Sequence, residues 1–134
     1  MEDRTDQILN LLEDINRVPR KSENRGPITG YFKTWASNNG FIYREDHVQN
    51  LVIEIPATAG YERAPMIVLQ GHTDMVCEKT PESNHDFSKD AIIHVREGDW
   101  LSAAGTSLGA DNGIGLAMAM EVAVNKDIEH PPLE

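Results

Sequence analysis

Two short stretches of this sequence hold residue types whose spacing suits chemistry. The first is Gly71-His72-Thr73-Asp74, which begins one residue after the apolar run 66–69. An imidazole that binds a metal ion needs its other ring nitrogen held by a carboxylate or a carbonyl group. Because side chains two positions apart on extended backbone point to the same side, Asp74 can hold His72 in this way. The alternative interpretation is a strand end where both side chains make only local hydrogen bonds.

The second stretch is Gly109-Ala110-Asp111-Asn112-Gly113-Ile114-Gly115, which leads into an apolar helical sequence. Its glycines allow the backbone to approach a ligand closely and to take φ/ψ values that other residues avoid. The alternative interpretation is that Asp111 caps the helix, since aspartate is a preferred capping residue. A phosphate-binding loop is disfavoured, because the glycine spacing is wrong, no lysine follows, and a carboxylate stands where the anion would bind.

The composition is that of an ordinary globular protein, with 134 residues of which 40% are hydrophobic and 25% charged. The net charge of −10, without a cluster of lysine and arginine, argues against nucleic-acid binding. No apolar run approaches the ~20 residues that cross a bilayer, so we expect no membrane partner. The polar N-terminus lacks a signal-peptide pattern and Cys77 is the single cysteine, which together favour a cytoplasmic location.

Hydrophobic periodicity predicts helices on either side of a strand-rich middle. Apolar residues recur at helical spacing over residues 5–17, and a second helix begins near residues 22–27 and ends at Asn39-Gly40. The segment 114–124 is apolar almost all round, which is typical of a helix inside a protein.

Five segments are predicted as strands: 41–44, 51–55, 66–69, 92–95 and 100–102. The last two flank Glu97-Gly98-Asp99 and indicate a hairpin, whereas the continuous apolar run 66–69 predicts a strand buried on both faces. Strands and helices therefore alternate, which favours an α/β fold with a mixed central sheet and helices packed on it. Residues 77–90 are polar and indicate a long surface excursion.

At these residues the sequence resembles the aminoacyl-histidine dipeptidases (Xaa-His or carnosinase-like dipeptidases), a branch of the co-catalytic zinc peptidases and deacylases. The resemblance covers nearly the whole chain and runs through five stretches: 56–60, 68–76, 85–90, 105–115 and 130–134. The sequences His85-Asp-Phe-Ser-Lys-Asp90 and Leu108-Gly-Ala-Asp-Asn-Gly-Ile-Gly115 are specific to this branch.

The resemblance implies a role for three residues. His72 matches the first metal-ligand histidine, and Asp111 matches the carboxylate that bridges two metal ions. Asp74 matches the active-site acid that holds the histidine, which makes it the catalytic candidate. The resemblance also implies a cis peptide bond between Asp111 and Asn112. The family's remaining parts, a Glu-Glu pair that includes the general base, a further aspartate and a histidine, would lie beyond Glu134.

The implied activity is hydrolysis of a dipeptide of the Xaa-His type by a water molecule that two bridged metal ions activate. Zinc is the expected metal for histidine and carboxylate ligands, although manganese or cobalt suits the same set. The alternatives are a related deacylase with another acyl group and a non-catalytic binding domain derived from the family.

The last residues, Pro131-Pro132-Leu133-Glu134, break the preceding helix and have the pattern of a strand that is just starting. We therefore expect residues 1–134 to be the N-terminal portion of the catalytic domain, truncated before the remaining metal ligands. Such a chain would expose an open sheet edge and part of the apolar helix 114–124. We accordingly expect self-association through that face.

Overall fold

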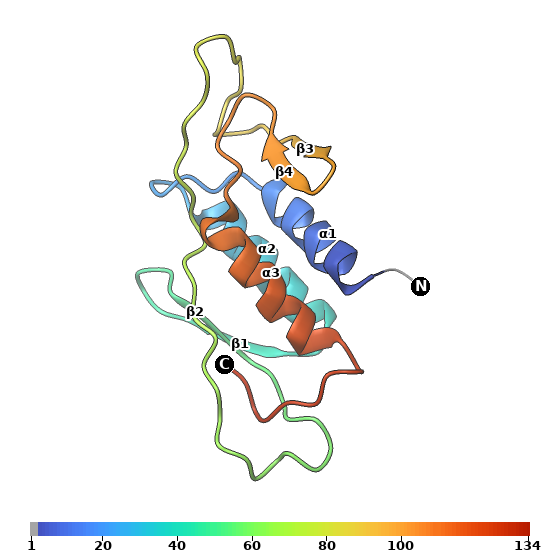
Figure 1. Ribbon diagram of the computed structural model, residues 1–134. Helices are drawn as coiled ribbons and strands as arrows, with labels where there is room; N and C mark the ends of the chain where they lie inside the picture. The colour runs from blue at the N-terminus through green and yellow to red at the C-terminus, as the bar shows by residue number, and fades with distance from the viewer. Residues whose placement is uncertain (1–2) are drawn as a thin grey trace.

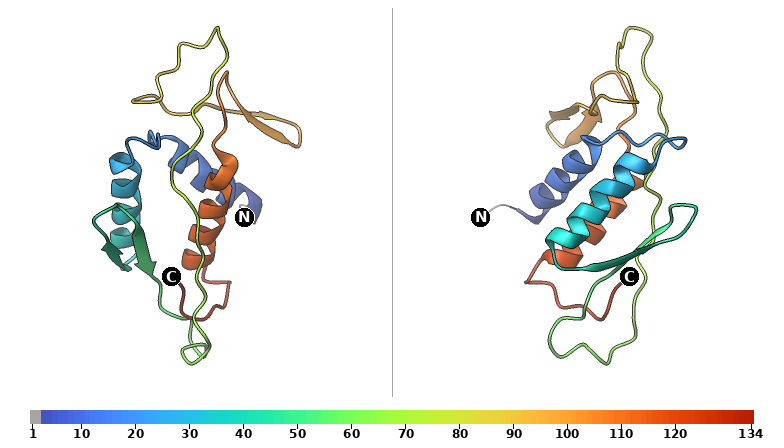
Figure 2. Two further views of the ribbon diagram at one scale, coloured as in Figure 1. Left: turned by 90° about the vertical axis from the view of Figure 1, so that its left-hand side faces the viewer. Right: turned by 180° about the vertical axis from the view of Figure 1, so that it is seen from behind.

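The computed structural model describes residues 3–134, which form three helices and two antiparallel hairpins (Figure 1). Helices α1 (Arg4–Asn16) and α3 (Ala110–Val124) lie side by side, and α2 (Gly26–Asn38) runs along the same side of the molecule (Figures 1 and 2). The core between them contains six buried apolar residues: Leu12, Ile15, Ile28, Phe32, Ala117 and Met120. Because every helix contributes to this set, the core is an interface between helices.

The first two helices follow the local signals of the sequence. In α1 the buried residues Leu12 and Ile15 lie on one face, and Pro19 prevents the chain from continuing as a helix. Helix α2 has Pro27 in its first turn, where the missing N–H has no helical partner to lose. After α2, Gly40 takes a φ of 73°, the left-handed conformation that commonly follows a helix. Both predicted helices are confirmed.

The two hairpins lie toward opposite ends of the molecule (Figure 1). Strand β1 (Ile42–Glu45) pairs antiparallel with β2 (Leu51–Glu54). Strand β3 (His94–Glu97) pairs antiparallel with β4 (Trp100–Ala103), and Gly98 in the turn has a φ of 58°. The predicted hairpin and the first two predicted strands are therefore confirmed, with ends that differ by one or two residues.

The prediction of an α/β fold holds. The named strands of residues 3–134 form two separate two-stranded antiparallel sheets, and isolated bridges at Leu133, one antiparallel and one parallel, connect further segments in the manner of a mixed sheet. The apolar run 66–69 is also not buried, since its side chains are between 43% and 61% exposed. Leu133 forms isolated bridges with Ile55 and Ile67, so it lies between these two segments. A strand is buried on both faces only where other elements cover both, and within the described residues nothing covers 66–69 in this way.

Helix α3 starts at Ala110 and not at residue 114, and its apolar surface is only partly covered. Its buried residues are Gly113, Ala117, Met120 and Glu121. Met118, in contrast, is 52% exposed. The expectation that part of this apolar helix is exposed in the chain is therefore borne out. One neighbour of α3 is the segment through Gly71, where a Cβ would lie 3.0 Å from side-chain atoms of Asn112 and Leu116.

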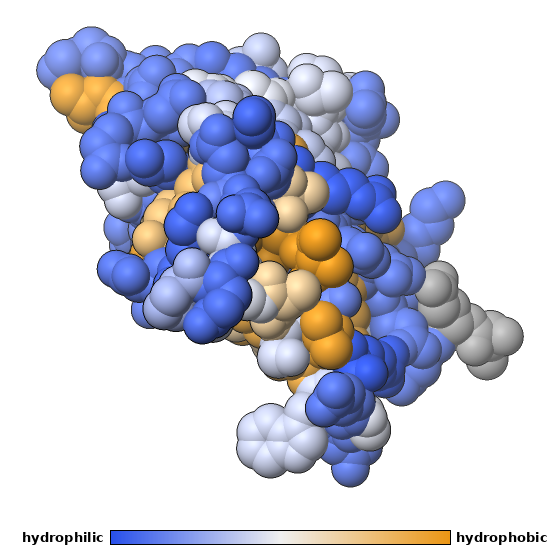
Figure 3. All heavy atoms as spheres, turned by 90° about the horizontal axis from the view of Figure 1, so that it is seen from above, coloured by the Kyte–Doolittle hydropathy of each residue, from blue (hydrophilic) through white to orange (hydrophobic). Residues whose placement is uncertain are grey.

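Residues 77–90 form the predicted excursion without a helix or a strand, at the end of the molecule that carries β3 and β4 (Figure 1). Seen from that end, the surface is mostly hydrophilic, and apolar atoms gather near its centre (Figure 3). No helix among residues 3–134 has both the length and the hydropathy to span a membrane.

Candidate functional site

The structure brings His72 and Asp111 together, although they are 39 positions apart in the sequence. Nε2 of His72 lies 3.2 Å from Oδ1 of Asp111. His72 belongs to the extended segment after residues 66–69, and Asp111 belongs to the first turn of α3. The two meet because the segment through Gly71 passes alongside the start of that helix. The predicted convergence is confirmed, but it occurs beside a helix and not at the edge of a sheet.

Asp74 contacts the other nitrogen of the same imidazole. Nδ1 of His72 lies 3.2 Å from Oδ1 of Asp74 and 3.0 Å from the carbonyl oxygen of Asp74. Ser22 donates its hydroxyl to Oδ2 of Asp74 at 2.5 Å, and this hydrogen bond is the main cause that lowers the pKa of the carboxyl. Asp74 is thus an ionised acceptor in the place from which it can orient His72.

Both ring nitrogens of His72 therefore face acceptors. A neutral imidazole carries one N–H and can donate to only one of them. The second contact requires a proton or another cation on the remaining nitrogen. The hydrogen bond to Asp111 is accordingly the main cause that raises the pKa of His72. A cation shared by Nε2 and Asp111 would satisfy the same arrangement.

The pair of His72 and Asp111 fits a divalent metal ion by donor type and by spacing. Imidazole nitrogen and carboxylate oxygen bind zinc at roughly 2.0–2.2 Å, so two such ligands in a tetrahedral site lie about 3.4 Å apart. The observed separation of 3.2 Å is close to that value. The described residues 3–134 hold no group of three or more His, Cys, Asp or Glu that could bind a metal ion. Since zinc sites take three or four protein ligands, this pair alone supplies too few ligands for such a site.

The loop that presents Asp111 departs from an ordinary helix start. The Asp111–Asn112 peptide bond is cis, as predicted. Gly109 is the N-cap residue of α3, with a φ of 73°, and no side chain caps the helix. The alternative interpretation, in which Asp111 serves only as a helix cap, is therefore wrong. The side chain of Asp111 is 96% exposed, which leaves its second oxygen open to a ligand.

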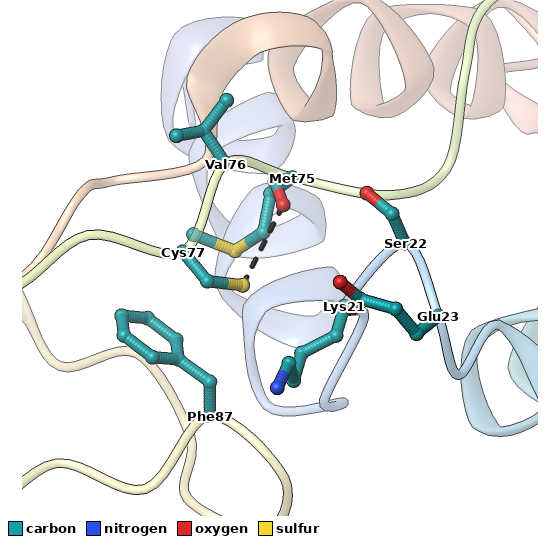
Figure 4. Close-up of a pocket in the computed structure, with 7 residues that line it drawn as sticks. All are labelled: Lys21, Ser22, Glu23, Met75, Val76, Cys77 and Phe87. Atoms are coloured by element: carbon teal, nitrogen blue, oxygen red, sulfur yellow. Dashed lines mark hydrogen bonds between the residues drawn. The ribbon is translucent and has the colours of Figure 1, made fainter.

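A cavity of about 310 Å³ lies between the turn after α1 and the segment after Asp74 (Figure 4). Its lining residues are Lys21, Ser22, Glu23, Met75, Val76, Cys77 and Phe87. The three predicted site residues do not line it, but Ser22 connects it to Asp74. Burial raises the pKa of the Cys77 thiol, which disfavours a thiolate nucleophile there.

Sequence reasoning missed two residues beside the site. Ser22 fixes Asp74, and Arg20 donates to the backbone carbonyl groups of Thr73 and Gly109. Their sequence context gives no signal, because polar residues in a turn after a helix are ordinarily solvated. Arg20 is nevertheless only 2% exposed.

Known proteins with similar sequences and structures are peptidases. No family model matches the chain. The cytosol non-specific dipeptidase of Escherichia coli (strain K12) is 42% identical over 124 residues, which make up 92% of this chain and 26% of that protein. The crystal structure of the aminoacylhistidine dipeptidase from Vibrio alginolyticus matches with a TM-score of 0.91 and 39% identity, over 95% of this chain and 26% of that one.

Two more distant structures share the fold. They are a tripeptidase from Staphylococcus aureus, with a TM-score of 0.73 and 21% identity, and the aminopeptidase PepT from Bacillus cereus, with 0.74 and 20%. They match 96% and 97% of this chain, which covers 34% and 35% of theirs.

The chain spans about a quarter of the length of the two dipeptidases, but they match nearly all of it. The sequence match and the structural match point to the same group of proteins, and both include the stretches that carry the site. Over nearly all of its length, the chain is similar to part of an aminoacyl-histidine dipeptidase.

Proposed function

We propose that this chain takes part in the metal-dependent hydrolysis of dipeptides of the Xaa-His type. His72 and Asp111 are the metal ligands, and Asp74 is the acid that holds His72. The observation that carries the proposal is the pair of acceptors on the two ring nitrogens of His72. This arrangement favours a cation between Nε2 and Asp111. It also favours the tautomer of His72 whose proton is on Nδ1, facing Asp74.

Each residue has a separate task. Asp74 accepts a hydrogen bond from Nδ1–H of His72, which leaves the lone pair of Nε2 free to bind a cation. Asp111 has one oxygen toward His72 and a second open to solvent, which suits a carboxylate that bridges two ions. Two divalent ions bound there would polarise the scissile carbonyl group and lower the pKa of a water molecule. The general base and the remaining ligands are expected outside residues 3–134.

The names of the relatives support a dipeptide substrate. The relative from E. coli is called a cytosol non-specific dipeptidase, and that from Vibrio alginolyticus an aminoacylhistidine dipeptidase. The first name also supports a cytoplasmic location. Zinc is the metal that we propose, with manganese or cobalt as substitutes. A related deacylase would bind the same metals but cleave N-acyl amino acids, whereas a binding domain derived from the family would cleave neither.

Zinc titration of the 15N-labelled chain, followed by NMR, tests the ligand assignment. We expect the signals of His72 and Asp111 to shift together, and we expect His72→Ala and Asp111→Asn each to abolish that response. His47→Ala is the matched control, because His47 is an exposed histidine between β1 and β2. Zinc that leaves the signals of both proposed ligands unchanged would disprove the assignment.

We expect the zinc affinity of the chain to be weak and its hydrolysis of an Xaa-His dipeptide to be unmeasurable, because the described residues supply one histidine and one carboxylate. The same zinc-loaded sample can be assayed directly. Turnover comparable to that of a complete relative would contradict this expectation. It would place a general base within this chain, and Glu121 and His85 would be the first residues to replace.

A further inference from the structure

The proposed ligands lie on two segments, residues 71–74 and the first turn of α3, which do not pair with each other in a sheet. His72 and Asp111 are in contact, but their side chains are 53% and 96% exposed. An exposed contact between charged groups contributes little to stability, so this contact by itself holds neither segment in place. The separation of the two side chains must therefore be set by contacts elsewhere.

Arg20 makes such contacts from a buried position, where it is 2% exposed. Its Nη1 donates to the carbonyl oxygens of Thr73 and Asp74, at 3.2 Å and 3.4 Å. Its Nη2 donates to the carbonyl oxygen of Gly109 at 2.7 Å. One guanidinium group therefore joins the two backbone segments that carry the proposed ligands.

Asn16, the last residue of α1, supports this guanidinium. Its Oδ1 accepts from Nη2 of Arg20 at 2.8 Å, and its Nδ2 donates to the carbonyl oxygen of Leu108 at 2.8 Å. The backbone N–H of Met75 donates in turn to the carbonyl oxygen of Arg20 at 3.1 Å. Hydrogen bonds therefore connect both segments of the site, near Met75 and near Leu108, to the end of α1.

Packing around Arg20 shows that the loop before Asp111 is shaped to receive it. A Cβ at Gly109 would overlap Nη2 of Arg20, and a Cβ at Gly113 would lie 3.0 Å from the same nitrogen. Burial lowers the pKa of Arg20, and its Nε has no hydrogen-bond partner among the described residues. An apolar side chain would avoid that desolvation, but it could not donate to carbonyl groups on both segments.

We infer that Arg20 is a positioning residue, which sets the separation of His72 and Asp111 by holding the backbone of both segments. The inference rests on the proposed function in one respect, namely that the positioned pair binds a metal ion. The planar fork of arginine is needed because it donates in two directions at once. A lysine ammonium at this position would reach one segment and release the other.

Arg20→Lys and Arg20→Met test the inference, and Arg17→Met is the matched control, since Arg17 lies near the same helix end with its side chain 63% exposed. The first measurement is the set of NOEs between the ring of His72 and the β protons of Asp111. The second is the affinity for Zn²⁺, measured by NMR titration. We expect both Arg20 variants to lose the NOEs and to bind Zn²⁺ at least about tenfold more weakly.

The two measurements separate this inference from the proposed function. A folded Arg20 variant that keeps the NOEs and the Zn²⁺ affinity overturns the positioning role, even if it unfolds at a lower temperature. Lost NOEs in a chain whose wild type does not bind Zn²⁺ would support positioning and overturn the proposed function. If neither Arg20 variant folds, Asn16→Ala leaves Arg20 in place and removes the acceptor of its Nη2, together with the hydrogen bonds of Asn16 to Leu108 and His94. Weakened NOEs in that variant support the inference, and unchanged NOEs overturn it.

Discussion

At the scale of single residues, two carboxylates contact the same imidazole but differ in their surroundings. The side chain of Asp74 is 30% exposed and receives a hydrogen bond from Ser22, whereas that of Asp111 is 96% exposed. The fixed carboxylate is suited to orient His72, and the open carboxylate is suited to receive a ligand. Environment, more than residue type, suits the two aspartates to different tasks.

Replacing Asp74 tests this division of tasks. In Asp74→Asn the amide keeps the size of the side chain but removes the charge that favours Nδ1–H on His72. We expect the Zn²⁺ affinity to fall by about tenfold, as it does when partners of ligand histidines are removed. Asp86→Asn is the control, because Asp86 is a surface carboxylate bonded to Ser88 in the 77–90 excursion. Equal Zn²⁺ affinities for the two variants would contradict the holding role.

At the scale of elements, the site depends on how α3 begins. Gly109 turns the chain into the helix with a φ of 73°, and its carbonyl oxygen accepts from Arg20. Gly40, after α2, has the same φ of 73° but has no atom within 4 Å of the place of a Cβ. The two glycines therefore share a backbone conformation and differ in packing.

Alanine at these two positions separates conformation from packing. We expect Gly40→Ala to lower the free energy of unfolding by about 1 kcal/mol, which is the penalty of the left-handed conformation for alanine. Gly109→Ala should lower it by about 3 kcal/mol, because the new Cβ must also displace the buried guanidinium of Arg20. Urea denaturation of both variants provides the values. Similar decreases in the free energy of unfolding for the two variants would show that the contact between Gly109 and Arg20 is not tightly packed.

At the scale of the whole molecule, the backbone of the apolar run 66–69 is hydrogen-bonded on one edge to residues 132–134. Its side chains are largely exposed to solvent. Ile67 and Leu69 donate their N–H groups to Pro132 and Glu134, at 3.0 Å and 2.7 Å. Val68 is 61% exposed. A segment of this kind can pair with another chain or pack against its apolar surface. We propose that copies of the chain self-associate here.

Analytical ultracentrifugation at micromolar concentration tests self-association. We expect the wild type to sediment as an oligomer and Val68→Glu to sediment as a monomer, because a buried unpaired carboxylate would oppose the contact. Ile93→Glu is the control, since Ile93 is 64% exposed and precedes β3, away from residues 66–69. A wild type that is a clean monomer would refute the proposal.

The secondary structure and the site motifs could be predicted because they depend on residues close together in the sequence. The apolar spacing of α1, the turn at Gly98 and the two-residue spacing of His72 and Asp74 are all local features. The burial of 66–69 was predicted wrongly, because the same apolar run suits an inner strand and an exposed segment. Which of these it becomes depends on what covers it, and the run does not contain that information.

The sequence by itself determined the candidate site residues and the family that the chain resembles, because both depend on residue types and their order. Only the tertiary structure decided that Nε2 of His72 meets Asp111 across 39 positions. It also decided that Arg20, in a turn that looks solvated, is buried between the two segments. The physical reason is that burial and contact between distant segments depend on how the helices pack, whereas local spacing specifies only each element.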